Sequence, residues 1–173
     1  MNLNCLHTLI LCILSGSLHS IVSAECPLGW FHYDGSCLLF STNTMNWYNA
    51  NGWCRAHNAR LVEVASVGLM AYLRQTAKSY GHDYWLGGSD EVVEGLWQWS
   101  SIGKKITVSD WDPWQPDNFG NGQNCLRIWN QGNYHWDYGS CSIYFVIYVK
   151  QNSLQDPLGK NIRTFDHHNS FQK

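Results

Sequence analysis

Cysteines constrain this 173-residue chain more than any other feature of its sequence. Seven are present, and the first two, Cys5 and Cys12, lie in a segment without Asp, Glu, Lys or Arg that ends at Ala24. Its apolar run, 6–14, is followed by small and polar residues, as in a secretory signal peptide. The run is shorter than the roughly 20 apolar residues of a membrane-spanning helix. The sequence therefore predicts a signal peptide over 1–24 and a mature chain that is secreted into an oxidising, extracellular compartment.

Five cysteines remain after this segment, an odd number, so at least one lacks a partner within the chain. Cys26 and Cys37 flank a turn-rich aromatic segment, which a disulfide would staple into a hairpin. Cys125 and Cys141 enclose a Gly- and Asn-rich stretch, which a second disulfide would fix. Cys54 is the cysteine left over.

Charge and composition narrow the class of protein. Lys and Arg total 11 and Asp and Glu 13, which gives a net charge of −2 at pH 7. This balance argues against a nucleic-acid partner, and the chain has no polybasic membrane anchor. Aromatic residues make up 14% of the chain and include ten Trp, whereas disordered chains are poor in aromatics. We therefore expect one folded domain with no membrane insertion.

Two segments have helical periodicity. From Thr44 to about 57, apolar residues recur at three- and four-residue steps, with Thr44 as the predicted N-cap, although an Asn-Gly pair in the middle disfavours a helix. A second helix is predicted over 66–79, and Gly81 ends it.

Strands and a tail account for most of the remainder. The segment 27–41 alternates aromatic residues with Gly turns and predicts short strands. The run 143–149 is β-branched and predicts a buried strand. Residues 151–173 are polar, without periodicity or cysteine, and predict a mobile tail.

Several segments together resemble one known family. They are CPLGWFHYDGSCLLF (26–40), WYNANGWCRAHNARLVEV (47–64), WLGGSD (85–90), GLWQW (95–99), SDWDPWQPDN (109–118), QNCLRI (123–128) and HWDYGSC (135–141). Their order and spacing are similar to those of the C-type lectin-like domain over about 26–150. The resemblance implies an α+β fold, with two helices packed on small antiparallel sheets and a long loop region held by Ca²⁺ and a disulfide.

The resemblance implies a sugar site at Gln115-Pro116-Asp117, the variant associated with galactose-type sugars. Gln115 can ligate Ca²⁺ through its carbonyl oxygen and donate its NH₂ to a sugar hydroxyl, while Asp117 can ligate through one oxygen and accept a proton through the other. The order of donor and acceptor selects the pair of hydroxyls. We expect a cis bond before Pro116 and a sugar stacked on the ring of Phe119.

By the same resemblance, the principal Ca²⁺ site contains Gln115, Asp117, Gln123 and Asp137. The expected carbohydrate-binding residues are these four together with Phe119. Tyr138 stands where the family has an aspartate, so two carboxylates remain and weaker Ca²⁺ binding is expected. A register shifted by one residue would put Asp137 at the aspartate position instead, but Trp136 fits the family tryptophan better.

A second, auxiliary Ca²⁺ site in some relatives uses acidic residues after the WLGG-like motif. Here the matching positions are Asp90, Glu94, Asn118 and Asn124. Two carboxylates and two amides make a marginal site, and a solvated acidic turn is an equal alternative.

Cys54 departs from the family, whose partner cysteine falls in the last strand. We place that position at Tyr148, which leaves Cys54 either as a buried thiol against Tyr148 or paired with a second chain. A bridge closing such a loop contributes about 4–5 kcal/mol in the chain-entropy model.

The leading hypothesis is a secreted, Ca²⁺-dependent lectin that binds galactose or N-acetylgalactosamine on glycans, including microbial surface carbohydrates in innate immunity. The alternative is a Ca²⁺-independent protein- or surface-binding module on the same fold. No hydrolase motif is present, and the adjacent His167 and His168 supply no metal cage, so an enzyme is not expected. The sequence leaves the oligomeric state open, although a lectin gains avidity from multivalency.

Overall fold

The structure is a computed structural model, and it describes residues 26–120 and 122–152. The predicted signal peptide, His167 and His168 lie outside the described residues, as does all of the predicted tail beyond Asn152. No helix within the described ranges is long and apolar enough to cross a bilayer.

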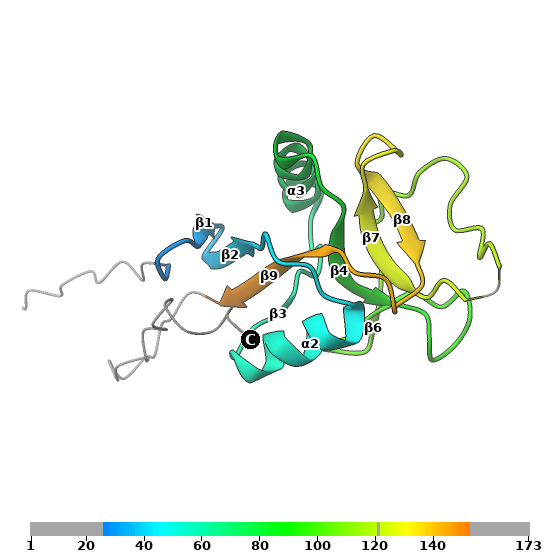
Figure 1. Ribbon diagram of the computed structural model, residues 1–173, viewed down its shortest axis with the longest axis horizontal. Helices are drawn as coiled ribbons and strands as arrows, with labels where there is room; N and C mark the ends of the chain where they lie inside the picture. The colour runs from blue at the N-terminus through cyan, green and yellow to red at the C-terminus, as the bar shows by residue number, and fades with distance from the viewer. Residues whose placement is uncertain (1–25, 121, 153–173) are drawn as a thin grey trace, which may run out of the picture.

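Nine strands and two helices make up the described fold (Figure 1). In chain order they are β1 (Phe31–Tyr33), β2 (Ser36–Phe40), α2 (Trp47–Ala56), β3 (Arg60–Leu61), α3 (Val67–Tyr80), β4 (Tyr84–Ser89), β5 (Gln98–Trp99), β6 (Lys104–Lys105), β7 (Cys125–Trp129), β8 (His135–Gly139) and β9 (Val146–Asn152). The sheet runs β1-β2-β9-β4-β5-β6, with β3 on β9 and with β7 joining β4 to β8. The α+β prediction is confirmed, but the sheet is mixed, because β4 and β9 are parallel.

The two helices lie on opposite sides of the central strands β9 and β4 (Figure 1). The apolar stripe of α3 enters one core cluster through Leu69, Leu73 and Ala77. The stripe of α2 enters a second cluster through Trp47, Ala50 and Cys54. Because β9 and β4 are covered on both sides, their residues are nearly all buried, and they form a rigid base for the loops beyond β4 and β7.

The ends of α3 match their prediction. Ser66 is the N-cap, and its hydroxyl accepts a hydrogen bond from the Leu69 amide at 3.2 Å. Gly81 ends the helix in the left-handed region, with φ 73°, and its N–H donates to the Ala77 carbonyl. Local sequence signals were sufficient here.

The start of α2 differs from its prediction. Asn46 is the N-cap, its side chain accepting from the Asn49 amide at 2.9 Å, so the helix begins at Trp47 and Thr44 lies outside it. The reason is tertiary: Met45 pairs with Phe145 as an isolated bridge, and its N–H donates to the Phe145 carbonyl at 2.9 Å. A residue held extended in this way cannot belong to the first helical turn.

The last strand is also displaced from the predicted 143–149. Ile143 donates its N–H to the Ser140 carbonyl in a turn, and both Ile143 and Tyr144 are exposed. The strand instead begins at Val146 and continues to Asn152, which pairs with Ser36 of β2. Pairing with β2 therefore extends the ordered chain into the segment predicted as tail.

Both predicted disulfides are confirmed. Cys26 and Cys37 close the β1–β2 hairpin, and Cys125 and Cys141 connect β7 to the chain after β8. Cys54 is free and fully buried, as one of the two alternatives predicts, and burial raises the pKa of its thiol to about 12. The thiol is therefore protonated and sequestered at neutral pH.

The neighbour predicted for Cys54 is wrong. Tyr148 lies in the core cluster on the α3 side, where its ring stacks on Tyr84 at 3.9 Å and its hydroxyl donates to the Leu73 carbonyl at 2.9 Å. Ile147 and Val149 are the β9 residues in the buried cluster of Cys54, and Val149 is the one that pairs with Leu61 of β3, the strand that follows α2. Successive strand residues point to opposite faces, so a one-residue difference in position changes the side of the sheet.

Candidate functional site

The long loop between β6 and β7 is fixed at its base by aromatic residues. Trp111 forms a bridge with Trp136 of β8, and the neighbouring backbone is joined by two hydrogen bonds, Asp112 N–H to the Trp136 carbonyl and Trp136 N–H to the Asp110 carbonyl. The Trp111 ring lies edge-on to Trp97 at 5.0 Å and to Trp136 at 5.8 Å. Trp97 and Trp136 are buried core residues against which the half-buried Trp111 packs, and the rest of the described loop, 112–120 and 122–124, projects from the sheet (Figure 1).

Within this loop the bond between Gln115 and Pro116 is cis, as predicted. The side chains of the tripeptide fold onto their own backbone. The Gln115 Oε1 accepts from the Asp117 amide at 3.3 Å, and the Asp117 Oδ1 accepts from the Phe119 amide at 3.2 Å. Each of these oxygens keeps a second lone pair, and the exposed Asp117 also keeps its other carboxylate oxygen for a ligand.

Gln123, half-buried, is held near the same loop by Asn118, whose Oδ1 lies 3.5 Å from the Gln123 amide nitrogen. Asn118 adopts the left-handed conformation, with φ 46°, which turns the chain back between the tripeptide and β7. The amide side chains of Gln115 and Gln123 thus belong to one folded loop.

Asp137, which was expected to be a Ca²⁺ ligand, forms an ion pair with Arg127. Its side chain is buried in β8, and its Oδ2 accepts from Arg127 of β7 at 2.9 Å (Nε) and 2.5 Å (Nη2). Arg127 also lies 3.5 Å from Asp83. In a strand the residues on either side, Trp136 and Tyr138, point the other way, and both contact the base of the loop.

The carboxylate of Asp137 is therefore engaged by Arg127 in this structure. Gln115, Asp117 and Gln123 remain as the candidate ligands of the principal site, with a single carboxylate among them. We leave Asp137 out of that set.

Of the residues expected in the auxiliary site, Asp90 is buried, Asn118 and Asn124 are half-buried and Glu94 is exposed. Asp90 is 2% exposed, and its Oδ2 accepts from the Gly95 amide at 2.9 Å. Its Oδ1 is buried without a hydrogen-bond partner, and so are the Oδ1 of Asn124 and the hydroxyl of Tyr138. Burial raises the pKa of Asp90, because it disfavours the charged carboxylate.

Tyr138 connects these residues with the loop. Burial raises the pKa of its phenol, and the charges of Asp117, Asp90 and Glu94 raise it further, so these carboxylates all act on one side chain. An unpartnered buried oxygen costs about 1–3 kcal/mol, which a bound hard cation would offset. The donor set here is all oxygen and fits Ca²⁺ in kind. No group of three or more His, Cys, Asp or Glu side chains in 26–120 and 122–152 is placed to hold a metal, so amide oxygens would have to contribute.

Two large aromatic side chains stand out of the loop on either side of the tripeptide. Phe119, expected as a stacking residue, is 80% exposed, and Trp114 is 84% exposed. Sequence reasoning missed Trp114. Its position directly before Gln115 was the available signal, but the sequence gives no means to distinguish it from Trp111, which packs into the core.

Comparison with known proteins gives the family of this chain. The family described as "Lectin C-type domain" matches residues 43–147, which is more than half of the chain. The chain belongs to this family. Its relatives include perlucin of Haliotis laevigata, which is 34% identical over 146 residues, covering 82% of this chain and 94% of perlucin.

Solved C-type lectin domains have the same fold. The carbohydrate-recognition domain of the mouse scavenger receptor C-type lectin superposes with a TM-score of 0.68 at 22% identity, covering 76% of this chain and 100% of that domain. A calcium-independent type II antifreeze protein superposes with a TM-score of 0.67 at 22% identity, covering 75% of this chain and 96% of the other. These likenesses establish the fold of this C-type lectin domain.

Proposed function

We propose that this C-type lectin domain is a secreted carbohydrate-binding protein that binds galactose-type sugars at the loop 112–124. The observation that carries the proposal is the tripeptide Gln115-Pro116-Asp117, presented on the loop between two exposed aromatic rings, Trp114 and Phe119. An exposed ring offers a flat apolar face, against which the C–H face of a galactose ring can pack. The amide and carboxylate beside it supply the donor and acceptor that fix the orientation of the sugar hydroxyls.

The order of these two groups supports galactose over mannose. Gln115 provides an NH₂ donor on one side of Pro116, and Asp117 provides only acceptors on the other. Exchanging them by the double substitution Gln115→Glu with Asp117→Asn reverses the donor and acceptor sides while the net charge stays the same. We expect this variant to lose galactose binding and to gain affinity for mannose.

Calcium is proposed as a cofactor of low affinity. Gln115, Asp117 and Gln123 would hold the ion at the loop, and Asp90, Glu94, Asn118 and Asn124 would hold a second. When bound, such an ion accepts sugar hydroxyl oxygens into its coordination shell. Because affinity follows the number of carboxylates, we expect a Kd of about 10⁻⁴–10⁻³ M, the range of weak extracellular calcium modules.

Affinity chromatography tests this proposal. The mature protein is applied to galactose-agarose with millimolar Ca²⁺, and elution is compared for galactose, mannose and EDTA. Elution by galactose and by EDTA, but not by mannose, is the expected result. Gln131→Glu with Asp34→Asn is a matched control, since both residues are exposed, lie outside the loop and exchange the same groups. Failure of the wild type to bind any sugar resin would refute the proposal.

A second candidate function is calcium-independent recognition through the same loop. The pairing of Asp137 with Arg127 favours it, because it removes a carboxylate from the principal site. The fold tolerates such a state, since a calcium-independent antifreeze protein has it. Elution by galactose but not by EDTA would identify this case.

A further inference from the structure

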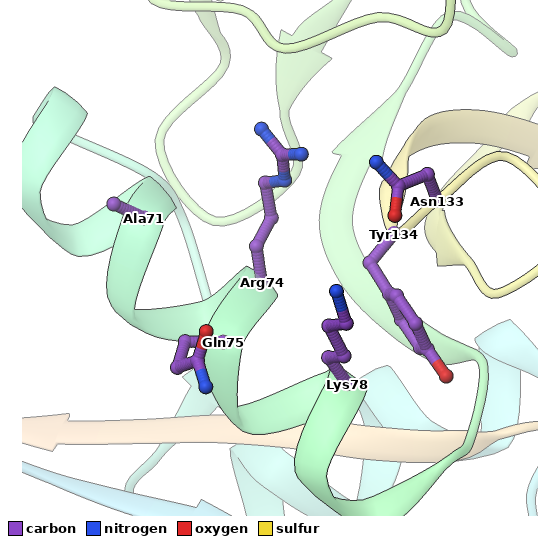
Figure 2. A pocket seen from close by; sticks show the side chains of 6 residues that line it. All are labelled: Ala71, Arg74, Gln75, Lys78, Asn133 and Tyr134. Carbon is purple, nitrogen blue, oxygen red and sulfur yellow. The ribbon is translucent and has the colours of Figure 1, made fainter.

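A cavity of about 210 Å³ opens between α3 and the turn that joins β7 to β8 (Figure 2). Its lining consists of Ala71, Arg74, Gln75 and Lys78 from α3 and Asn133 and Tyr134 from the turn. The four helix residues are spaced i, i+3, i+4, i+7 and so share one face, while Leu73 and Ala77 on the other face enter the core. None of the lining residues belongs to the loop 112–124.

The lining carries two cations and no carboxylate. Figure 2 shows the Arg74 and Lys78 side chains rising from the helix, with the side chains of Asn133 and Tyr134 across the opening. Lys78 is exposed and makes no ion pair within the described residues. The amides of Gln75 and Asn133 add further N–H donors. A cavity of this composition attracts a negatively charged group.

Arg74 is held in place before any ligand binds. Its Nη1 lies 3.3 Å from the Asp110 Oδ2, and its Nη2 lies 2.9 Å from the His135 Nε2. The other ring nitrogen of His135 lies 2.9 Å from the Asp110 Oδ1. Since guanidinium has five N–H donors in a rigid fork, these contacts fix its orientation and leave donors for a planar or tetrahedral anion. Asp110 offsets one of the two positive charges, so the site has an excess of one.

The opposite wall is a tightly held turn. Asn133 and Tyr134 both have positive φ, 51° and 63°, a conformation that residues with side chains rarely adopt. The Tyr134 N–H donates to the Trp129 carbonyl at 2.9 Å, and a Cβ on Gly132 would come within 2.7 Å of the Trp129 ring. Strained backbone that is fixed by its surroundings is common at ligand sites, and here it holds an amide and a phenol at the cavity.

We propose that this cavity binds the anionic group, a sulfate or a carboxylate, of an acidic saccharide. The Arg74 fork and the Lys78 ammonium bind the anion, and the Asn133 amide and the half-buried ring of Tyr134 contact the sugar that carries it. The site does not depend on the tripeptide or on calcium. It gives the domain a second, independent carbohydrate contact.

The proposal is tested by measuring how the mature protein binds to immobilised dextran sulfate. The measurement is made in EDTA and low salt, with uncharged dextran as the reference. We expect Lys78→Glu to weaken binding at least tenfold and Lys78→Arg to preserve it. Lys104→Glu on β6 is the matched control, because Lys104 is exposed and the net charge changes equally; binding within twofold of wild type is expected. Gln75→Glu places a carboxylate in the cavity without removing Lys78 and should also weaken binding.

The outcomes separate the alternatives. Equal losses for Lys78→Glu and Lys104→Glu, or binding to neither dextran sulfate nor hyaluronan, would overturn the proposal. Inorganic sulfate that competes as well as dextran sulfate at equal sulfate concentration would overturn the saccharide contact and leave only a free-anion site. Hyaluronan, whose only anions are carboxylates, distinguishes the two groups, and binding to either polymer supports the proposal. The Lys78→Glu variant should still be retained on galactose-agarose in every case. This result keeps the test of the cavity separate from the test of galactose binding at the loop.

Discussion

Replacing Val149 with Cys should create a third disulfide, with Cys54. Both residues are fully buried in one cluster, and the chain between them links the two positions directly: the Ala59 N–H donates to the Cys54 carbonyl at 2.8 Å, and Leu61 of β3 then pairs with Val149 of β9. The new bond would close a loop of about 95 residues, for which the chain-entropy model gives about 4–5 kcal/mol.

The expected net gain is smaller, because Val149 fills space in the core. Exchanging its side chain for the smaller Cys removes buried apolar volume and costs about 1 kcal/mol. The free energy of unfolding should therefore rise by about 3–4 kcal/mol. For a domain of this size that corresponds to a rise in Tm of roughly 10–15 °C.

Urea and thermal unfolding, followed by tryptophan fluorescence after oxidative refolding, measure this gain. The control is Val149→Cys in a Cys54→Ala background, which keeps the substitution but lacks the partner. This comparison is preferable to adding reductant, which would also open the bonds of Cys26 and Cys125. Non-reducing mass spectrometry should find no free thiol in Val149→Cys. A persistent free thiol there, or formation of the bond by Tyr148→Cys instead, would refute the assignment of Val149 as the neighbour of Cys54.

Three further predictions concern single side chains. Burial raises the pKa of Asp90, so the folded chain keeps this proton to higher pH than the unfolded chain, and stability is lost as pH rises through the shifted pKa. Asp90→Asn should therefore raise Tm at pH 7 in EDTA, flatten this part of the pH profile and abolish stabilisation by Ca²⁺; a lower Tm in EDTA would contradict this reasoning. Trp114→Ala should change stability by less than about 0.5 kcal/mol, because the ring is 84% exposed, but should weaken retention on galactose-agarose, and unchanged retention would exclude a sugar contact. Tyr148→Phe should cost about 0.5–1.5 kcal/mol in urea unfolding by removing the buried hydrogen bond from its hydroxyl to the Leu73 carbonyl, and a neutral effect would argue against that hydrogen bond.

Local signals predicted the elements that depend on local interactions. The α3 helix has a cap at Ser66 and a terminating Gly81, and both act within a turn of their own position. The first residues of α2 and β9 were misplaced, because a bridge between Met45 and Phe145 sets both. The two residues are 100 positions apart in the chain, and no local pattern encodes their contact.

The candidate site likewise has features that the sequence predicted and features that depend on tertiary contacts. Resemblance of the motif located Gln115, Asp117 and Phe119 and predicted the cis bond at Pro116, because these features lie within five consecutive residues. It did not predict the ion pair of Asp137 with Arg127, since that pair depends on the pairing of β7 with β8, which sets Arg127 opposite Asp137.

The sequence by itself determined the family, the two disulfides and the tripeptide, because each depends on particular residue types at short, fixed spacing. The tertiary structure alone decided which oxygens remain without partners around Tyr138, which side chain faces Cys54, and that Arg74 and Lys78 share a cavity with a turn more than fifty residues away. The physical reason is that side-chain direction reverses at every strand residue, and burial depends on what the rest of the fold brings alongside. Neither quantity is a property of a short segment, so both are settled only when the whole sheet and its two helices are assembled.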